Sequence, residues 1–284
     1  KVIVVDDSGM ERRTPADPEK FKDANKRFVE GLRKHPVTGQ GLPTYGTNVL
    51  QNVINEAGGL PTHNFLMGRF DGCAKISGEA QAELENKRGG EGSATHGCHR
   101  GCVIRCSGTF YDKSGAYLTK QPEYETVWAH GSNCGIDDLD VIAQLDRMDD
   151  DFGLDTIEMG ATIGVAMEAG LAKFGDAEAA LRLVKEVGQG TPLGRVLGSG
   201  AYVTGQVFGV ERIPVVKRQA MPAYDPRAVQ GIGVTYATST MGADHTAGYT
   251  IAPEIAGVGG KSDPLASEPG KADLAPSSLD VLRA

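Results

Sequence analysis

The residues best suited to chemistry are three cysteines that recur at every fourth position. Cys98, Cys102 and Cys106 lie in the segment HGCHRGCVIRC, residues 96–106. Thiolates in such a run can hold an iron–sulfur cluster, and a loop would also bring backbone N–H groups to the cluster sulfurs. Glycines precede the first two cysteines and favour a loop over a helical face. The spacing therefore predicts a metal or cluster site.

Zinc is the alternative occupant of this site. It would accept the three thiolates together with His96 or His99 in a tetrahedral arrangement. Arg100 and Arg105 make the segment too polar for a run of buried structural thiols. An odd total of five cysteines, without a secretory signal, argues against a disulfide framework. Iron–sulfur is thus favoured over zinc.

A second candidate is the segment DDFGLDT, residues 150–156. Its glycine can end one helix, and Asp155 can cap the next. In addition, Asp150 can accept hydrogen bonds from the N–H groups of a heterocycle. The free backbone N–H groups at the start of the following helix can hold an anion.

Two glutamates and a histidine complete the candidates. Glu123 and Glu125 are separated by one residue, so in an extended chain they point to opposite sides and only one is expected to enter a site. His245 stands among small residues, and from composition alone it is best interpreted as a core histidine with its hydrogen bonds satisfied.

The elements that must position these residues are mostly helices, because capping residues precede most of the apolar-patterned segments. The sequence predicts a mainly α fold with a few short strands and a soft boundary near residues 218–224. The expected helices run from Pro18 to about His35, from Thr47 to Gly58, from Asp137 or Asp138 past Met148, from Asp155 past Met167, from Asp176 to Val187 and from Pro192 to Leu197. A hairpin is expected from Gly108 to Leu118, after a glycine-rich loop at residues 89–93.

Composition narrows the function classes. The chain has 284 residues, of which 40% are hydrophobic and 23% are charged, and its net charge is −8. This charge argues against nucleic acid or an anionic membrane as the main partner. No stretch approaches the roughly 20 apolar residues of a membrane span. The chain begins without Met, so we expect a cytoplasmic protein whose native N-terminus is not in view.

Seven short segments carry a resemblance to a known family. In their order along residues 1–251, they resemble the second and third domains of the aldehyde ferredoxin oxidoreductases. The segments are LPTYGT (42–47), GLPTHNF (59–65), KISGE (75–79), PEYET (122–126), DDFGLD (150–155), PAYDPR (222–227) and YATS (236–239).

The resemblance implies an enzyme that oxidises aldehydes to carboxylic acids. The family carries tungsten or molybdenum in a bis-molybdopterin cofactor, next to a [4Fe–4S] cluster, and passes electrons to ferredoxin or an iron–sulfur electron-transfer subunit. It also allows a homodimer. The implied domains are residues 1–220, a helical domain with the cluster loop and the first pterin motif, and residues 221–284, the truncated start of a second helical domain.

The resemblance also implies a role for each candidate residue. Glu125 matches a carboxylate beside the metal, and His245 matches a proton donor. The implied cluster ligands are Cys98, Cys102 and Cys106, and the first pterin motif comprises Asp150, Gly153, Leu154, Asp155 and Thr156.

Two departures from the family pattern stand out. Three residues separate Cys98 from Cys102, where the family commonly has two, and this favours a divergent branch with another substrate. The family's N-terminal β-rich domain and its second pterin motif, which ends in the fourth cluster cysteine, are absent. We therefore expect an incomplete enzyme. A zinc-stabilised helical scaffold or interaction subunit without redox activity is the alternative function.

Overall fold

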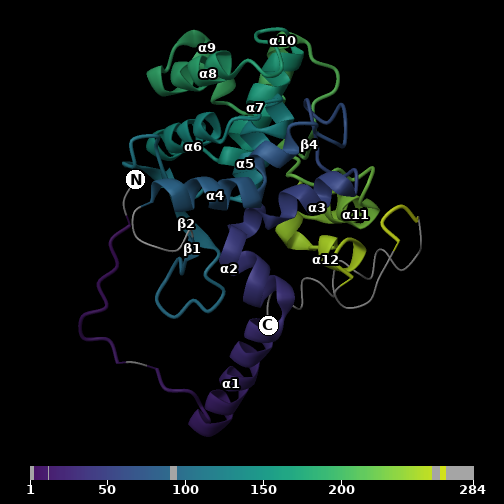
Figure 1. Ribbon diagram of the computed structural model, residues 1–284. Helices are drawn as coiled ribbons and strands as arrows, with labels where there is room; N and C mark the ends of the chain where they lie inside the picture. Colours follow the sequence, from purple (N-terminus) through teal and green to yellow (C-terminus); the bar gives the residue numbers. More distant parts are fainter. Residues whose placement is uncertain (1–2, 12, 90–94, 258–262, 267–284) are drawn as a thin grey trace.

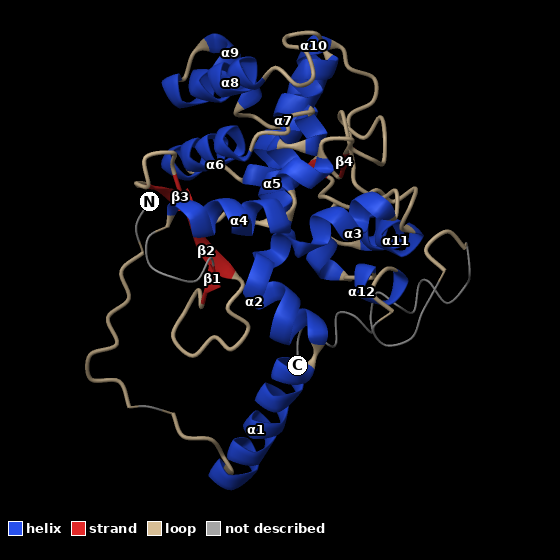
Figure 2. Cartoon of the chain, viewed as in Figure 1, coloured by secondary structure: helices blue, strands red, loops and turns tan. Residues whose placement is uncertain are grey.

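The protein is predominantly helical, as the sequence predicts. The computed structural model describes residues 3–11, 13–89, 95–257 and 263–266. Most of the loop expected at residues 89–93, and most of the chain after residue 257, lie outside the described residues. Helices form the body of the molecule, and the strands are few and short (Figure 2).

The helices and strands follow one another with short connections. The helices are α1 (Pro18–Lys34), α2 (Leu42–Tyr45), α3 (Leu50–Glu56), α4 (Gly78–Arg88), α5 (Tyr124–His130), α6 (Leu139–Phe152), α7 (Thr156–Glu168), α8 (Ala177–Gln189), α9 (Pro192–Leu197), α10 (Ala201–Phe208), α11 (Gln230–Thr238) and α12 (Ile251–Glu254). The strands are β1 (Thr95–His96), β2 (Ser107–Tyr111), β3 (Tyr117–Lys120), β4 (Val215–Val216) and β5 (Gln219–Ala220). Short 3-10 or π turns cover Val37–Gly41, Gly46–Val49, Cys73–Ile76, Ser132–Cys134 and His245–Ala247.

Side-chain caps begin the long helices where the sequence predicts them. Asp17, Asp138, Asp155 and Asp176 each accept a hydrogen bond from a backbone N–H in the first turn of their helix. These bonds satisfy donors that have no partner within the helix. The helix expected from Thr47 differs in its start, because residues 46–49 form a 3-10 turn and α3 begins only at Leu50.

The core is built around α5 and α7. Trp128 of α5 is fully buried, and its indole N–H donates to the carbonyl of Pro61 at 2.8 Å. Gly160 of α7 lets the two helices approach closely, since a Cβ at this position would lie 2.5 Å from the Cβ of Ala129. Helices α8, α9 and α10 gather at one end of the molecule, whereas α1 projects from the opposite end (Figure 1).

A small antiparallel sheet carries the cysteine segment. Strand β2 pairs with β1 on one side and with β3 on the other. Residues 97–106, which contain the three cysteines, form the connection between β1 and β2. Thr119 of β3 donates to buried Asp146 of α6 at 2.7 Å, which fixes the sheet against the helical core.

The segment after residue 220 packs on the same core as the rest. The hydroxyl of Tyr124 donates to the carbonyl of Ala223 at 2.8 Å, and the backbone N–H of Asp225 donates to Gly59 at 3.0 Å. Buried Ile232 and Tyr236 join the main hydrophobic cluster. A domain boundary near residue 220 therefore stays a prediction. Within the described residues, no helix combines the length and apolar character needed to cross a bilayer.

Candidate functional site

The cysteine segment is a loop, as its glycines indicate. Cys98 is exposed and Cys102 is half-buried. The ligand atoms of Cys98, His99 and Cys102 all lie within 4.8 Å of one another. Backbone N–H groups approach the Cys102 sulfur, with that of Arg105 at 3.5 Å, and lower the pKa of this thiol. Such donors stabilise a thiolate, the form that binds metal.

Cys106 does not belong to the group of Cys98, His99 and Cys102 and directly precedes β2. Burial raises the pKa of its thiol, and the carboxylate of Glu123 raises it further. Negative charge on the thiolates of Cys102 and Cys98 also raises this pKa. The assignment of these three cysteines as ligands remains a prediction. The remaining two cysteines, Cys73 and Cys134, are buried thiols.

A cavity of about 410 Å³ brings together residues that lie far apart in the sequence. It opens between the start of α5, the turn at residues 46–49 and the segment around His245. Both Glu125 and His245 face it, although α6 to α11 separate them along the chain. The lining residues are Thr47, Leu50, Glu123, Tyr124, Glu125, Tyr224, His245, Thr246 and Tyr249.

Glu125 and His245 are close enough to exchange a proton through a small rearrangement. Oε1 of Glu125 lies 3.7 Å from Nε2 of His245, while Oε2 accepts a hydrogen bond from the Ala223 N–H at 2.9 Å. Burial raises the pKa of Glu125 to about 8 against the effect of that bond, and Asp155 adds to the rise. Burial also lowers the pKa of His245, with Asp244 opposing. Both shifts favour the uncharged forms, a protonated carboxyl and a neutral imidazole.

The expectation that only one of the two glutamates enters a site is wrong. It assumed an extended chain, but residues 124–130 form α5, with Glu123 at its N-cap position and Glu125 in its first turn. Both side chains line the cavity. The hydroxyl of Thr47 donates to Oε2 of Glu123 at 2.5 Å and accepts from the Tyr124 N–H at 2.9 Å.

The interpretation of His245 as a core residue is also wrong, because its side chain is 20% exposed and faces the cavity.

Sequence reasoning missed the tyrosines around His245. The rings of Tyr224 and Tyr249 lie 5.6 and 6.2 Å from the imidazole, and their hydroxyls share a hydrogen bond of 2.9 Å. Tyr224 lies inside the segment PAYDPR, whose sequence alone indicates no role for this ring.

The DDFGLDT segment ends α6 and begins α7, as expected. Gly153 adopts a left-handed conformation at the end of α6, with φ +69°, and Asp155 caps α7 by accepting from the Glu158 N–H at 2.8 Å. The Thr156 hydroxyl lies 2.9 Å from that of Thr126 in α5, which connects the segment to the helix that carries Glu125.

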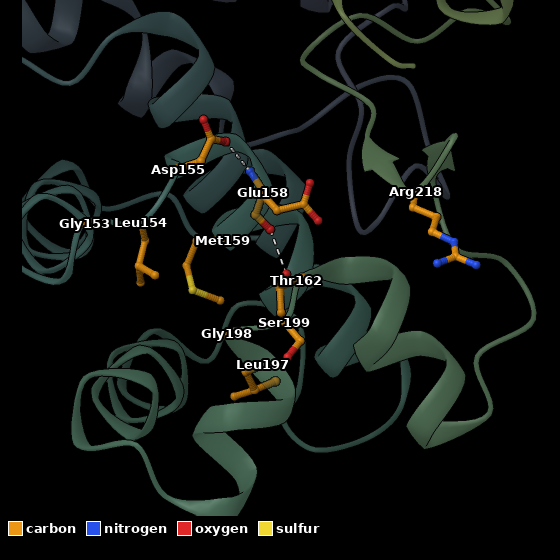
Figure 3. A pocket seen from close by; sticks show the side chains of 11 residues that line it. Gly153, Leu154, Asp155, Glu158, Met159, Thr162, Leu197, Gly198, Ser199 and Arg218 are labelled. Atoms are coloured by element: carbon orange, nitrogen blue, oxygen red, sulfur yellow. Dashed lines mark hydrogen bonds between the residues drawn. The ribbon is translucent and has the colours of Figure 1, made fainter. Parts of the chain in front are cut away.

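A second cavity, of about 300 Å³, opens beside this segment (Figure 3). The carboxylate of Glu158 accepts from the N–H groups of Ala201 and Ala220, each at 2.9 Å, and so ties α7 to α10 and β5. The cavity is lined by Gly153, Leu154, Asp155, Glu158, Met159, Thr162, Leu197, Gly198, Ser199, Gly200 and Arg218.

Asp150 and Asp155 do not line the cavity that Glu125 and His245 face. Asp155 lines the second cavity, and its charge raises the pKa of Glu125. Asp150 is exposed near the end of α6 and lines neither cavity. The two cavities share no lining residue, and the pterin-binding role of residues 150–156 stays a prediction.

Comparison with known proteins assigns the sequence to a family. Residues 23–283 match the family model described as "Aldehyde ferredoxin oxidoreductase, domains 2 & 3". The chain belongs to this family. The predicted mainly α fold, with a few short strands, is confirmed by the helices of the structure and by this match.

Curated relatives of this family agree. The tungsten-containing aldehyde ferredoxin oxidoreductases of Pyrococcus horikoshii and Pyrococcus abyssi are each 39% identical to the chain over an alignment that covers 93% of it. The alignment covers 45% of each relative, so the chain spans under half of their length. The WOR-like subunit of the aliphatic sulfonate oxidoreductase of Pyrococcus furiosus is 28% identical over 51% of the chain and 27% of that relative.

Proposed function

We propose that the chain forms the helical, cofactor-facing part of an enzyme that oxidises aldehydes to carboxylic acids. A tungsten or molybdenum bis-molybdopterin cofactor and a [4Fe–4S] cluster would supply the electron-accepting chemistry, with ferredoxin or an iron–sulfur electron-transfer subunit as the partner that receives the electrons. The observation that carries the proposal is the Glu125–His245 pair, which faces a cavity in a member of the aldehyde ferredoxin oxidoreductase family. A cytoplasmic location and a homodimer stay predictions.

The cysteine loop suits a cluster. It offers three thiols on one irregular segment, and backbone N–H groups point at the sulfur of Cys102. Cys98, Cys102 and Cys106 would hold the cluster. Gln121, which follows β3, has a buried carboxamide whose nitrogen and oxygen lack hydrogen-bond partners among the described residues. Its N–H group is therefore available to donate a hydrogen bond to a bound group.

The segment from Asp150 to Thr156 suits a pterin. The exposed carboxylate of Asp150 can accept from ring N–H groups, and the first turn of α7 has backbone N–H groups without helical partners. Asp150→Ala should lower pterin occupancy because this acceptor is lost. Full occupancy in that variant would leave the segment with only its role in ending and capping helices.

Glu125 and His245 would divide the proton transfers. Conversion of an aldehyde and water into a carboxylic acid releases two electrons and two protons. The bound metal centre and cluster would supply the electron acceptors. Glu125, once deprotonated, is placed to accept a proton as water attacks the aldehyde carbon. Neutral His245 can take up the second proton, so in this proposal it is an acceptor at that step and not the proton donor that the resemblance implies. The hydroxyls of Tyr224 and Tyr249 can orient the substrate.

Zinc remains the second candidate, because the ligand atoms of Cys98, His99 and Cys102 are close enough to bind one ion. In that case the chain would be a helical scaffold or interaction subunit without redox activity.

Aldehyde-dependent electron transfer tests the proposal directly. The holoenzyme, purified without oxygen, should reduce ferredoxin when an aldehyde is supplied, and turnover should require tungsten or molybdenum during growth. A protein loaded with both metal centres that oxidises none of a panel of aliphatic and aromatic aldehydes would contradict the proposed substrate class.

A further inference from the structure

The carboxamide of Gln121 is held beside the cysteine loop. Gln121 follows β3 directly, and its backbone N–H donates to the carbonyl of Gly108 at 2.9 Å. Gly108 belongs to β2, two residues after Cys106. The side chain of Gln121 is 2% exposed. Pairing of β2 with β3 thus fixes the depth and position of this amide next to the last cysteine of the loop.

Gly46 keeps the space between this amide and Cys106 open. Its φ is +63°, and a Cβ placed on it would lie 2.9 Å from Nε2 of Gln121 and 3.0 Å from the carbonyl oxygen of Cys106. The amide and the Cys106 carbonyl therefore border the same small space. Any side chain at residue 46 would collide with both, and the conformation itself favours glycine.

The amide nevertheless makes no hydrogen bond in the described parts of the chain. Both Nε2 and Oε1 of Gln121 are buried without a partner. A buried amide without partners is unfavourable, and in a native protein it indicates an ion, a water or another bound group. Thiolate and sulfide sulfurs of an iron–sulfur cluster accept hydrogen bonds from N–H donors, and these bonds change the reduction potential of the cluster.

We propose that the Nε2–H group of Gln121 donates a hydrogen bond to a sulfur on the Cys106 side of the cluster and raises its reduction potential. The bond stabilises the more negative, reduced cluster. Gln121 is thus a positioning and tuning residue for electron transfer, not a ligand. This inference rests on the proposed function, because it requires a cluster at Cys98, Cys102 and Cys106.

Gln51 offers a matched control in the same chain. It is fully buried, and both atoms of its carboxamide also lack partners among the described residues. It belongs to α3, where its backbone carbonyl accepts from the thiol of Cys73 instead of bordering the cysteine loop. Replacement of either glutamine removes a buried amide, but only Gln121 should affect the cluster.

The test compares Gln121→Met, Gln121→Asn and Gln51→Met in the anaerobic holoenzyme. Iron content is measured first, and the cluster is then titrated with reductant and followed by electron paramagnetic resonance. Both Gln121 variants should decrease the ratio of reduced to oxidised cluster several-fold at a fixed potential, whereas Gln51→Met should match the wild type. A tenfold decrease corresponds to about 59 mV for a one-electron couple.

The possible outcomes distinguish failure of the proposed function from failure of the role of Gln121. Wild-type protein without iron would reject the proposed function itself. A cluster that is present but has unchanged potential in both Gln121 variants would reject the role of Gln121 alone. Loss of the cluster from both Gln121 variants, but not from Gln51→Met, would show that Gln121 is needed for cluster assembly and would overturn its role in tuning.

Discussion

Oε1 of Glu125 lies 3.7 Å from Nε2 of His245, at the wall of one cavity. Burial shifts the two groups in opposite directions, since it raises the pKa of the carboxyl to about 8 and lowers the pKa of the imidazole. Both shifts favour the uncharged forms. Perturbed titrating groups that share a cavity are typical of catalytic sites. Here they favour a resting pair in which the carboxyl of Glu125 is protonated and the imidazole of His245 is neutral.

Replacement of Glu125 by glutamine should remove the proton acceptor while it preserves the shape of the side chain. We expect turnover to decrease by roughly a hundredfold or more, with an unchanged cluster spectrum. Glu123→Gln is the matched control, because Glu123 lines the same cavity but bonds to Thr47 instead of approaching His245. Wild-type turnover in Glu125→Gln would remove this residue from the mechanism.

The same pair predicts how activity depends on pH. If Glu125 accepts a proton, only its deprotonated form is active, and that form increases as the pH rises through about 8. The value of kcat/KM should therefore increase across this range. The increase should vanish from the residual activity of Glu125→Gln. A wild-type profile that is flat between about pH 6 and about pH 9 would argue against Glu125 as the base.

A buried carboxyl outside the cavity predicts a pH effect on stability. Glu85 of α4 is 2% exposed, and burial raises its pKa from 4.5 to about 8, with Gln81 opposing and Glu123 adding to the rise. The folded state then binds this proton more tightly than the unfolded state does. The free energy of unfolding should accordingly fall as the pH rises from about 4.5 to about 8.

Glu85→Gln isolates this contribution, because it keeps the size of the side chain and cannot ionise. At pH 8 and above, the variant should be more stable than the wild type by on the order of a few kcal/mol, measured by denaturant unfolding. Near pH 4 the two should be similar. Equal pH dependence in both proteins would show that Glu85 has no raised pKa.

Sequence reasoning succeeded where a single residue determines local structure. Asp138, Asp155 and Asp176 begin helices because each side chain needs only a backbone N–H two or three residues ahead. It failed at the start of α5, where the opposite orientation expected for Glu123 and Glu125 requires an extended chain. Tertiary contacts, such as the bond from Tyr124 to Ala223, stabilise a helix that local patterning does not indicate.

The candidate site was only partly accessible from the sequence. The cysteine spacing alone indicated a metal site, whereas the pairing of Glu125 with His245 came from the family resemblance. No sequence pattern would have placed the amide of Gln121 beside Cys106, because strand pairing and the absence of a side chain at Gly46 bring the two together.

The close contact between α5 and α7 predicts a strong effect of a small substitution. In Gly160→Ala the new methyl would lie 2.5 Å from the Cβ and 2.6 Å from the carbonyl carbon of Ala129, which is too close without movement of a helix. We expect destabilisation by about 1–3 kcal/mol or more. Gly31→Ala in exposed α1 is the control, since nothing lies within 4 Å of its added Cβ. Equal melting temperatures for Gly160→Ala and the wild type would disprove this packing.

Metal analysis combined with a visible spectrum tests most directly whether the cysteine loop serves redox chemistry. The holoenzyme purified without oxygen should be brown, with absorbance at about 400 nm, and should contain iron, sulfide and tungsten or molybdenum. Cys106→Ser should lose much of the iron, whereas Cys134→Ser, which alters a thiol sealed in the core, should keep it. A colourless protein that contains zinc and no iron would contradict the account.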